Sequence, residues 1–162
     1  EIQVRGPGVT PGYWHDPEAT IAAFTADGWF RTGDAGRMTE QGIIFVVDRI
    51  KDMYISGGEN VYPAEVEGVI DDLDAVSQCA VIGVPDRKWG EVGLALVVPR
   101  PGQPLAPERI LEHCRERLAR YKVPRDVRIV PALPLSPQGK ILKRELHRLY
   151  VESGGPPPSQ VA

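Results

Sequence analysis

Three segments of the sequence place charged side chains beside glycine turns, where a ligand could come close to the backbone. The first segment is Gly28–Asp34, which ends in Gly33-Asp34. A carboxylate on a tight turn can accept two hydrogen bonds from a cis-diol, such as that of a ribose. The alternative is a hairpin in which Asp34 only caps backbone N–H groups. Taken alone, the spacing favours this structural role.

The second segment is Asp48–Asn60, which combines charges with two adjacent glycines. Arg49 offers a planar donor fork that is always charged. Gly57 and Gly58 permit positive φ angles and a close approach of a ligand to the backbone. The alternative, again favoured by the spacing alone, is a loop with solvated charges before a helix that begins at Pro63.

The third segment is Pro134–Ile141, in which prolines and a glycine present a single lysine, Lys140, on a turn. A lysine ammonium suits phosphate or carboxylate oxygens. The alternative is an exposed lysine at a helix start, although positive charge there is slightly unfavourable against the helix dipole. The basic residues that follow are expected to form a solvated helix face with Lys140: Lys143, Arg144 and Arg148.

Other familiar chemistries find no support in the sequence. The three histidines, His15, His113 and His147, are far apart, and His113 is expected in solvent. No Ser-His-Asp set or HExxH motif is present. Cys79 and Cys114 are too few for a disulfide framework or a four-cysteine zinc site, and both are expected in the core. We therefore expect no metal site in this chain.

Length and composition describe an ordinary globular chain. It has 162 residues, 42% hydrophobic and 25% charged, with a formal net charge of −3. This charge gives no attraction to nucleic acid. No apolar run is long enough for a membrane span, and no signal peptide is recognisable. We expect a cytoplasmic protein. The chain lacks an initiator Met and opens within a strand-like pattern, so we expect a fragment of a longer protein.

The hydrophobic patterns predict the elements that carry these segments. A short strand at 2–5 and a helix near Asp16-Pro17 precede a hairpin with strands at 36–38 and 43–47. Helices are then expected from Pro63, over 107–121 and over 141–150, with strands at 77–84, 93–98 and 127–130. This order predicts a compact α+β domain with a mixed sheet of about three strands flanked by helices, preceded by the hairpin.

The three segments occur together with further motifs in a fixed order, and this set resembles the C-terminal part of the adenylate-forming enzymes. The motifs are Gly33-Asp34, Asp48-Arg49-Ile50-Lys51, residues 56–67, Val84-Pro85-Asp86, Trp89-Gly90-Glu91, Tyr121-Lys122-Val123-Pro124 and Pro137-Gln138-Gly139-Lys140. The resemblance runs from Val4 to Leu149, and the sequence is most similar to fatty acyl-CoA synthetases. This resemblance reverses the preference for a structural role in each of the three segments.

The resemblance implies a role for each segment. Asp34 and Arg49 would bind the nucleotide ribose, and Lys51 would be the hinge. Lys140 would be the catalytic lysine that bridges the substrate carboxylate and the α-phosphate. The loop Gly57-Gly58-Glu59 would face the pantetheine of CoA.

The resemblance also implies an organisation and a reaction. The implied divisions are the end of a large domain at 1–48, the hinge at 49–51, the small domain at 52–150 and a disordered tail at 151–162. By the resemblance, a carboxylic acid, expected to be a fatty acid, would react with Mg-ATP to give an acyl-adenylate. The small domain would then rotate, and the CoA thiol would attack the acyl-adenylate. ATP, Mg²⁺ and CoA would be substrates of the parent enzyme rather than bound cofactors.

Two alternatives to a CoA ligase remain open at this stage. The family's phosphate-binding loop and acyl pocket lie upstream in a missing N-terminal large domain, so we expect no activity from the fragment alone. The acyl group could go to a carrier-protein phosphopantetheine instead of CoA. The chain could also be a non-catalytic binding module. Peripheral membrane contact would suit a lipid substrate, but no feature of the sequence indicates it.

Overall fold

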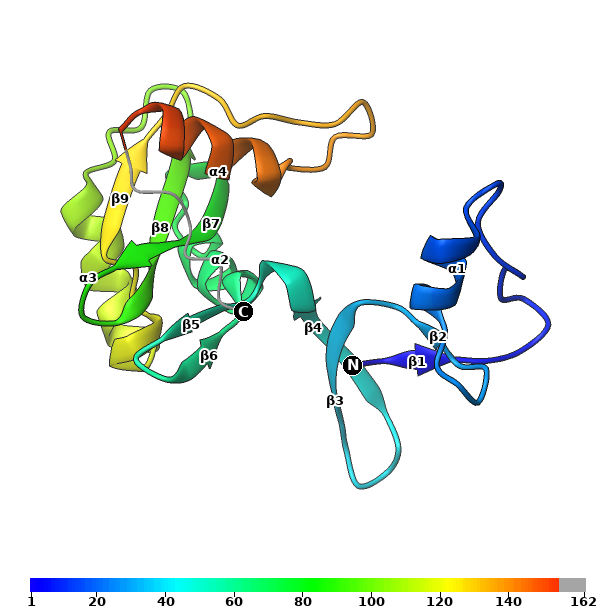
Figure 1. Cartoon of the computed structure of the whole chain (residues 1–162). Coiled ribbons are helices and arrows are strands. Elements are labelled where there is room, and N and C mark those ends of the chain that lie inside the picture. The colour runs from blue at the N-terminus through cyan, green and yellow to red at the C-terminus, as the bar shows by residue number, and fades with distance from the viewer. Residues whose placement is uncertain (155–162) are drawn as a thin grey trace. The chain divides into compact units, whose positions relative to one another are not determined.

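A computed structural model describes residues 1–154 of the chain. The chain divides into two compact units, one from Glu1 to Lys51 and the other beginning at Asp52 (Figure 1). This boundary lies at the C-terminal end of the segment 49–51 that we expected to be a hinge; its movement stays a prediction.

The first unit contains two small antiparallel pairs and a helix. Strand β1 (Gln3–Val4) pairs with β2 (Phe30–Arg31), and β3 (Asp34–Met38) pairs with β4 (Ile44–Arg49). Helix α1 (Pro17–Ala23) begins after Asp16, whose carboxylate accepts a hydrogen bond from the Ala19 backbone N–H at 2.9 Å. The short 3-10 helix η1 (Ile50–Asp52) crosses the boundary between the units.

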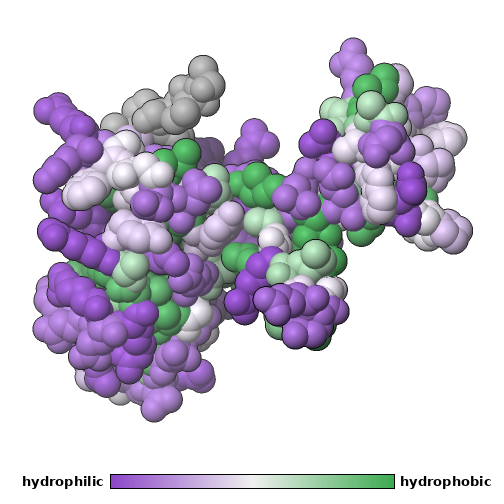
Figure 2. Space-filling view, turned by 90° about the horizontal axis from the view of Figure 1, so that it is seen from below, coloured by the Kyte–Doolittle hydropathy of each residue, from purple (hydrophilic) through white to green (hydrophobic). Residues whose placement is uncertain are grey.

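The β3–β4 hairpin exposes several apolar side chains, which along β4 alternate between its two faces. The exposed residues are Met38, Ile43, Ile44, Phe45 and Val46. Figure 2 shows hydrophobic side chains among the polar ones on this unit. Contiguous exposed apolar residues mark a surface that another chain segment or a partner covers.

The second unit is built on one five-stranded sheet with the order β6-β5-β8-β7, and β9 pairs with β8. The strands are β5 (Tyr54–Ser56), β6 (Glu59–Val61), β7 (Val76–Asp86), β8 (Gly90–Pro99) and β9 (Asp126–Ile129). Only the β8–β9 pair is parallel among the described strands, so the sheet is mixed. The helices are α2 (Pro63–Asp71), α3 (Pro107–Arg117), η2 (Arg120–Lys122) and α4 (Lys143–Glu152).

Both faces of this sheet are covered. Along β7, Cys79 and Val81 belong to a core that also contains Val66 of α2 and Ile110 of α3. The intervening β7 residues Ala80, Ile82 and Val84 belong to a second core, which contains Leu146 of α4. Successive side chains of a strand point to opposite faces, so α2 and α3 cover one face and α4 covers the other. This explains the nearly continuous apolar run in β7.

The structure confirms the α+β class and changes several details. The sheet has five strands rather than three, because β5 and β6 form a hairpin within the segment expected to be a loop. The helix expected over 107–121 ends at Arg117, and η2 follows it. Helix α4 continues to Glu152, inside the segment expected to be disordered. The remaining part of that predicted tail, 155–162, lies outside the described residues.

Within residues 1–154, the structure contains no helix with both the length and the apolar character needed to cross a membrane.

Candidate functional site

Asp34 and Arg49, the two residues expected to bind a nucleotide, face each other across the β3–β4 hairpin. They are partners in the strand register, and Arg49 Nε lies 3.0 Å from Asp34 Oδ1. Arg49 Nη1 also donates to the Thr32 carbonyl at 2.9 Å. Thr32 Oγ1 accepts a hydrogen bond from the Asp34 backbone N–H at 3.1 Å. The structure therefore brings the two predicted residues together and fixes the direction of both side chains.

An open pocket of about 370 Å³ lies beside this ion pair, within the first unit. Its lining residues are Glu1, Gly33, Arg49, Ile50 and Lys51. Lys51, the expected hinge residue, is exposed on η1 and is the last residue of the first unit. The wall of this pocket thus combines the cations Arg49 and Lys51 with the carboxylate of Glu1.

Gly57 and Gly58 form the two-residue turn between β5 and β6, with φ angles of +61° and +88°. Two-residue hairpin turns of type I′ need positive φ at both positions, which explains the adjacent glycines. The Gly57 N–H donates to the Trp89 carbonyl at 2.8 Å. A Cβ on Gly57 would lie 2.6 Å from Cε3 of the Trp89 ring, whereas a Cβ on Gly58 would meet nothing within 4 Å. Gly57 therefore permits close packing on Trp89, and Gly58 leaves open space.

A pocket of about 420 Å³ opens beside this turn. It is lined by Ser56, Lys88, Trp89, Val92, Arg120, Tyr121, Val123 and Arg125. A neighbouring pocket of about 510 Å³ shares Arg120 and Arg125 and adds Arg115. Aromatic rings attract cations and stack on planar groups, and the guanidinium and ammonium groups pair with phosphate. This surface therefore fits a ligand that joins a planar ring to phosphate groups.

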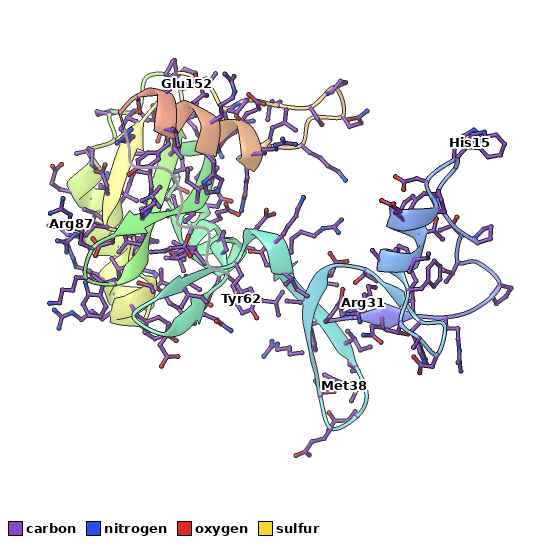
Figure 3. All side chains as sticks on the ribbon, viewed as in Figure 1. His15, Arg31, Met38, Tyr62, Arg87 and Glu152 are labelled. Atoms are coloured by element: carbon purple, nitrogen blue, oxygen red, sulfur yellow. The ribbon has the colours of Figure 1, made fainter. Side chains whose placement is uncertain are left out.

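The turn between β7 and β8 holds Trp89 in place. The carboxylate of Asp86 accepts the backbone N–H of Lys88 at 2.8 Å and that of Trp89 at 2.9 Å. These hydrogen bonds lower the pKa of Asp86, and the one from Trp89 has the larger effect. Arg87, labelled in Figure 3, marks this turn at the edge of the unit. Trp89 and Tyr121 belong to the family motifs, but the sequence assigns them no role, because they come near the glycine turn only on folding.

Lys140 is exposed on a hairpin closed by its own hydrogen bonds. The Ser136 N–H donates to the Lys140 carbonyl at 2.8 Å, and Leu142 N donates to the Pro134 carbonyl at 2.9 Å. Ser136 Oγ accepts the Lys140 backbone N–H at 3.2 Å. Gly139, with φ of +78°, supplies the turn. The backbone that carries Lys140 is thus ordered while its ammonium faces solvent.

The two loops of the second unit that we expected to take part in the reaction lie apart. In Figure 1 the turn between β5 and β6 and the long connection between β9 and α4, which contains Lys140, are at different ends of the unit. One compact unit therefore presents two distinct chemical surfaces: an exposed ammonium at one end, and a glycine turn beside a cationic, aromatic pocket at the other.

The remaining reactive side chains lie in packed surroundings. Cys79 and Cys114 are both buried and free, as predicted. His113 is half-buried with its Nε2 atom shielded from solvent, which corrects the expectation that it lies in water. Among residues 1–154, no group of three or more His, Cys, Asp or Glu side chains is arranged to hold a metal ion.

Comparison with known proteins finds one matching family model and relatives that are CoA ligases. Residues 65–140 match the family model of the AMP-binding enzyme C-terminal domain. The chain is 54% identical, over 90% of its length, to a Rhodococcus jostii ligase named for joining a (methyl-dioxo-octahydroindenyl)propanoyl group to CoA, and covers 28% of that protein. It is 49% identical to a long-chain-fatty-acid–CoA ligase of Mycobacterium tuberculosis, covering 93% of this chain and 29% of the relative.

Among solved structures, ATP-bound MatB from Rhodopseudomonas palustris matches with a TM-score of 0.85 and 40% identity, covering 91% of this chain and 29% of MatB. This chain is therefore similar to the C-terminal part of adenylate-forming enzymes, and the match to the AMP-binding enzyme C-terminal domain spans its residues 65–140. The chain spans less than a third of the length of these relatives.

Proposed function

We propose that this chain works as the C-terminal part of an ATP-dependent acid–CoA ligase whose N-terminal large domain supplies the acyl pocket. The relatives support the class, and the exposed apolar surface of the β3–β4 hairpin supports contact with a large domain. The proposed acid is a fatty acid, which the long-chain-fatty-acid–CoA ligase relative supports. We expect the 162-residue chain alone to be inactive.

In the proposed first half-reaction, a substrate carboxylate oxygen attacks the α-phosphorus of Mg-ATP. The bond to pyrophosphate breaks, and acyl-adenylate and pyrophosphate are the products. Asp34, held by Arg49, accepts hydrogen bonds from the ribose hydroxyls. Negative charge develops on the phosphoryl oxygens in the transition state, and the Lys140 ammonium offsets it.

In the proposed second half-reaction, the CoA thiolate attacks the acyl carbonyl carbon and AMP leaves. The small domain turns at Lys51, so that Lys140 withdraws and the turn Gly57-Gly58 reaches the site. The open space at Gly58 admits the pantetheine arm, and the neighbouring pocket binds the nucleotide end of CoA through Trp89 and its cations.

One observation carries this proposal. A single compact unit holds an exposed lysine on an ordered hairpin and, at a different end, a two-glycine turn beside a pocket suited to a nucleotide with phosphates. A non-catalytic module has no need for two such surfaces. The cationic pocket favours free CoA as the acceptor over a protein-bound phosphopantetheine, which lacks the nucleotide.

The test separates the half-reactions in the complete ligase. Lys140→Ala should lower pyrophosphate release about 10²–10³-fold, the cost of removing one transition-state donor. Thioester formation from supplied acyl-adenylate should survive, with Lys140→Arg as the matched cation control. Equal loss of both half-reactions would contradict the role of Lys140. Transfer to a phosphopantetheinylated carrier but not to CoA would establish the carrier alternative, and absence of any pyrophosphate release would establish the binding module.

A further inference from the structure

The residue Lys143, three positions after Lys140, does not lie on a solvated helix face as the sequence suggested. Its Nζ atom lies 2.8 Å from Glu67 Oε1, and the side chains of Lys143 and Glu67 are only 17% and 19% exposed. Lys143 is the first residue of α4, where positive charge is unfavourable against the helix dipole. The α4 N-cap, Leu142, gives no side-chain hydrogen bond. Helix stability therefore does not explain this lysine.

The Glu67 carboxylate joins three elements of the second unit. Besides Lys143, its Oε1 atom accepts the backbone N–H of Val81 in β7 at 2.7 Å. Among the described strands β7 pairs only with β8, so this N–H lies on its free edge. Glu67 itself belongs to α2. One half-buried carboxylate thus ties the first turn of α4 to both α2 and the sheet.

This tie involves the first residue of α4, three positions along the chain from Lys140. The hairpin is held to the unit by Leu133 on one side and by α4, through Leu146, on the other; both residues are buried in the core shared with β7. The residues between are closed by local hydrogen bonds, and Ile141, next to Lys140, packs partly buried against the same core. The direction of the Lys140 hairpin therefore depends on Ile141 and on where the first turn of α4 is fixed, and the contact of Lys143 with Glu67 fixes that turn.

A second carboxylate on α2 makes a corresponding contact toward the other functional surface. Both oxygens of Glu65 accept hydrogen bonds from Lys122 Nζ, at 2.6 and 2.7 Å. Lys122 lies in η2, between Tyr121 and Val123, which line the pocket beside the glycine turn. At about 100° per residue, Glu65 and Glu67 project in directions about 200° apart around the helix.

We propose that α2 is the common frame for both half-reactions. Glu67 and Lys143 are positioning residues for adenylation, because they fix the hairpin of Lys140. Glu65 and Lys122 are positioning residues for thioester formation, because they fix the pocket wall at Tyr121. This inference rests on the proposed function, and it assigns opposite effects to two glutamates that are two residues apart.

The experiment compares Glu67→Gln with Glu65→Gln in the complete ligase. Glutamine keeps an oxygen that can accept the Val81 N–H but removes the charge that pairs with lysine. For Glu67→Gln, kcat for pyrophosphate release should fall about 10–100-fold, as misplacement of a catalytic group does, with thioester formation from acyl-adenylate changed less than about twofold. Glu65→Gln should slow thioester formation from acyl-adenylate about 10–100-fold and change pyrophosphate release less than about twofold.

Variants of the partner lysine separate positioning from folding. Lys143→Met should reproduce Glu67→Gln, and the double variant should be no worse than either, because the pair acts as a unit. Lys143→Arg should restore most of the adenylation rate. Thermal unfolding of each variant should stay close to that of the wild type; if Glu67→Gln does not fold, the Lys143→Met and Lys143→Arg pair decides the question alone.

Each result has one meaning. Equal loss of both half-reactions in Glu67→Gln or Lys143→Met, or no loss in either, overturns the positioning roles. Loss of adenylation that Lys143→Arg does not restore also overturns them, since charge would then not be the cause. A wild-type ligase that makes no acyl-adenylate refutes the proposed function instead, and this outcome is visible before any variant is measured.

Discussion

Alanine at Gly57 and alanine at Gly58 impose the same backbone strain but different packing. Both positions have positive φ, +61° and +88°. An alanine held in this region costs about 1–2 kcal/mol relative to its preferred conformations. At Gly57 the new Cβ would also lie 2.6 Å from Trp89 Cε3 and 2.9 Å from Cζ3, so the indole ring must shift. At Gly58 the new Cβ would meet nothing within 4 Å.

The difference between the two variants isolates the contact with Trp89. Overpacking of this kind costs about 1–3 kcal/mol. Gly57→Ala should therefore lower the free energy of unfolding by about 2–5 kcal/mol, and Gly58→Ala by about 1–2 kcal/mol. Urea unfolding of the 162-residue chain, followed by far-UV circular dichroism, measures both values.

The functional consequence should fall on one half-reaction. Displacement of Trp89 alters the pocket proposed for CoA, so Gly57→Ala should slow thioester formation from supplied acyl-adenylate about tenfold or more, since about 1.4 kcal/mol corresponds to tenfold. Pyrophosphate release should stay near the wild-type rate, because Lys140 lies on a different loop. If the two variants match in stability and in CoA turnover, Trp89 does not pack on Gly57 as described, and the pocket assignment fails with it.

Two further predictions concern groups outside this pocket. Burial is the largest cause that raises the pKa of both thiols, and it raises that of Cys114 to about 11. We therefore expect neither Cys79 nor Cys114 to react with a thiol reagent at about pH 8 until urea unfolds the chain. Rapid labelling of the native chain would contradict the burial of these thiols. Burial also lowers the pKa of His147 on α4, against the opposing charges of Glu91 and Asp52. The unfolded chain then binds the proton more readily, so the free energy of unfolding should decrease as the pH falls below 6.5, and His147→Asn should lessen this decrease; an unchanged slope would show that His147 keeps its ordinary pKa.

The elements with strong periodicity could be predicted from the sequence, and the short ones could not. Val66 and Ile70 recur at helical spacing in α2, and β7 is a long apolar run, so tertiary packing agrees with the local pattern. The strands β5 and β6 have only three residues each, and β6 begins with the charged Glu59, which conceals them. The adjacent glycines between them were the available signal, because a two-glycine turn flanked by β-forming residues indicates a hairpin.

The sequence could predict those parts of the candidate site whose residues are close together in the chain. It could not predict contacts between residues that are far apart in the chain and come together only on folding. Asp34 and Arg49 lie on neighbouring strands of one hairpin, so their pairing follows from its register. Trp89 meets Gly57 only because Gly90, the first residue of β8, pairs with Ser56 of β5. Glu67 and Lys143 come from helices on opposite faces of the sheet, and no local pattern indicates their contact.

Under the proposed function, the contacts of α2 allow one small domain to serve two half-reactions without making one depend on the other. Flexible catalytic loops need a rigid support, but a shared support transmits disturbance from one loop to the other. Glu65 and Glu67 project from α2 in different directions, and each ties a different loop through its own lysine. Between them lies Val66, which is fully buried in the core of α2, α3 and the sheet. A change at either glutamate therefore reaches its own loop directly, whereas the other loop is separated from it by a packed core that resists small displacements.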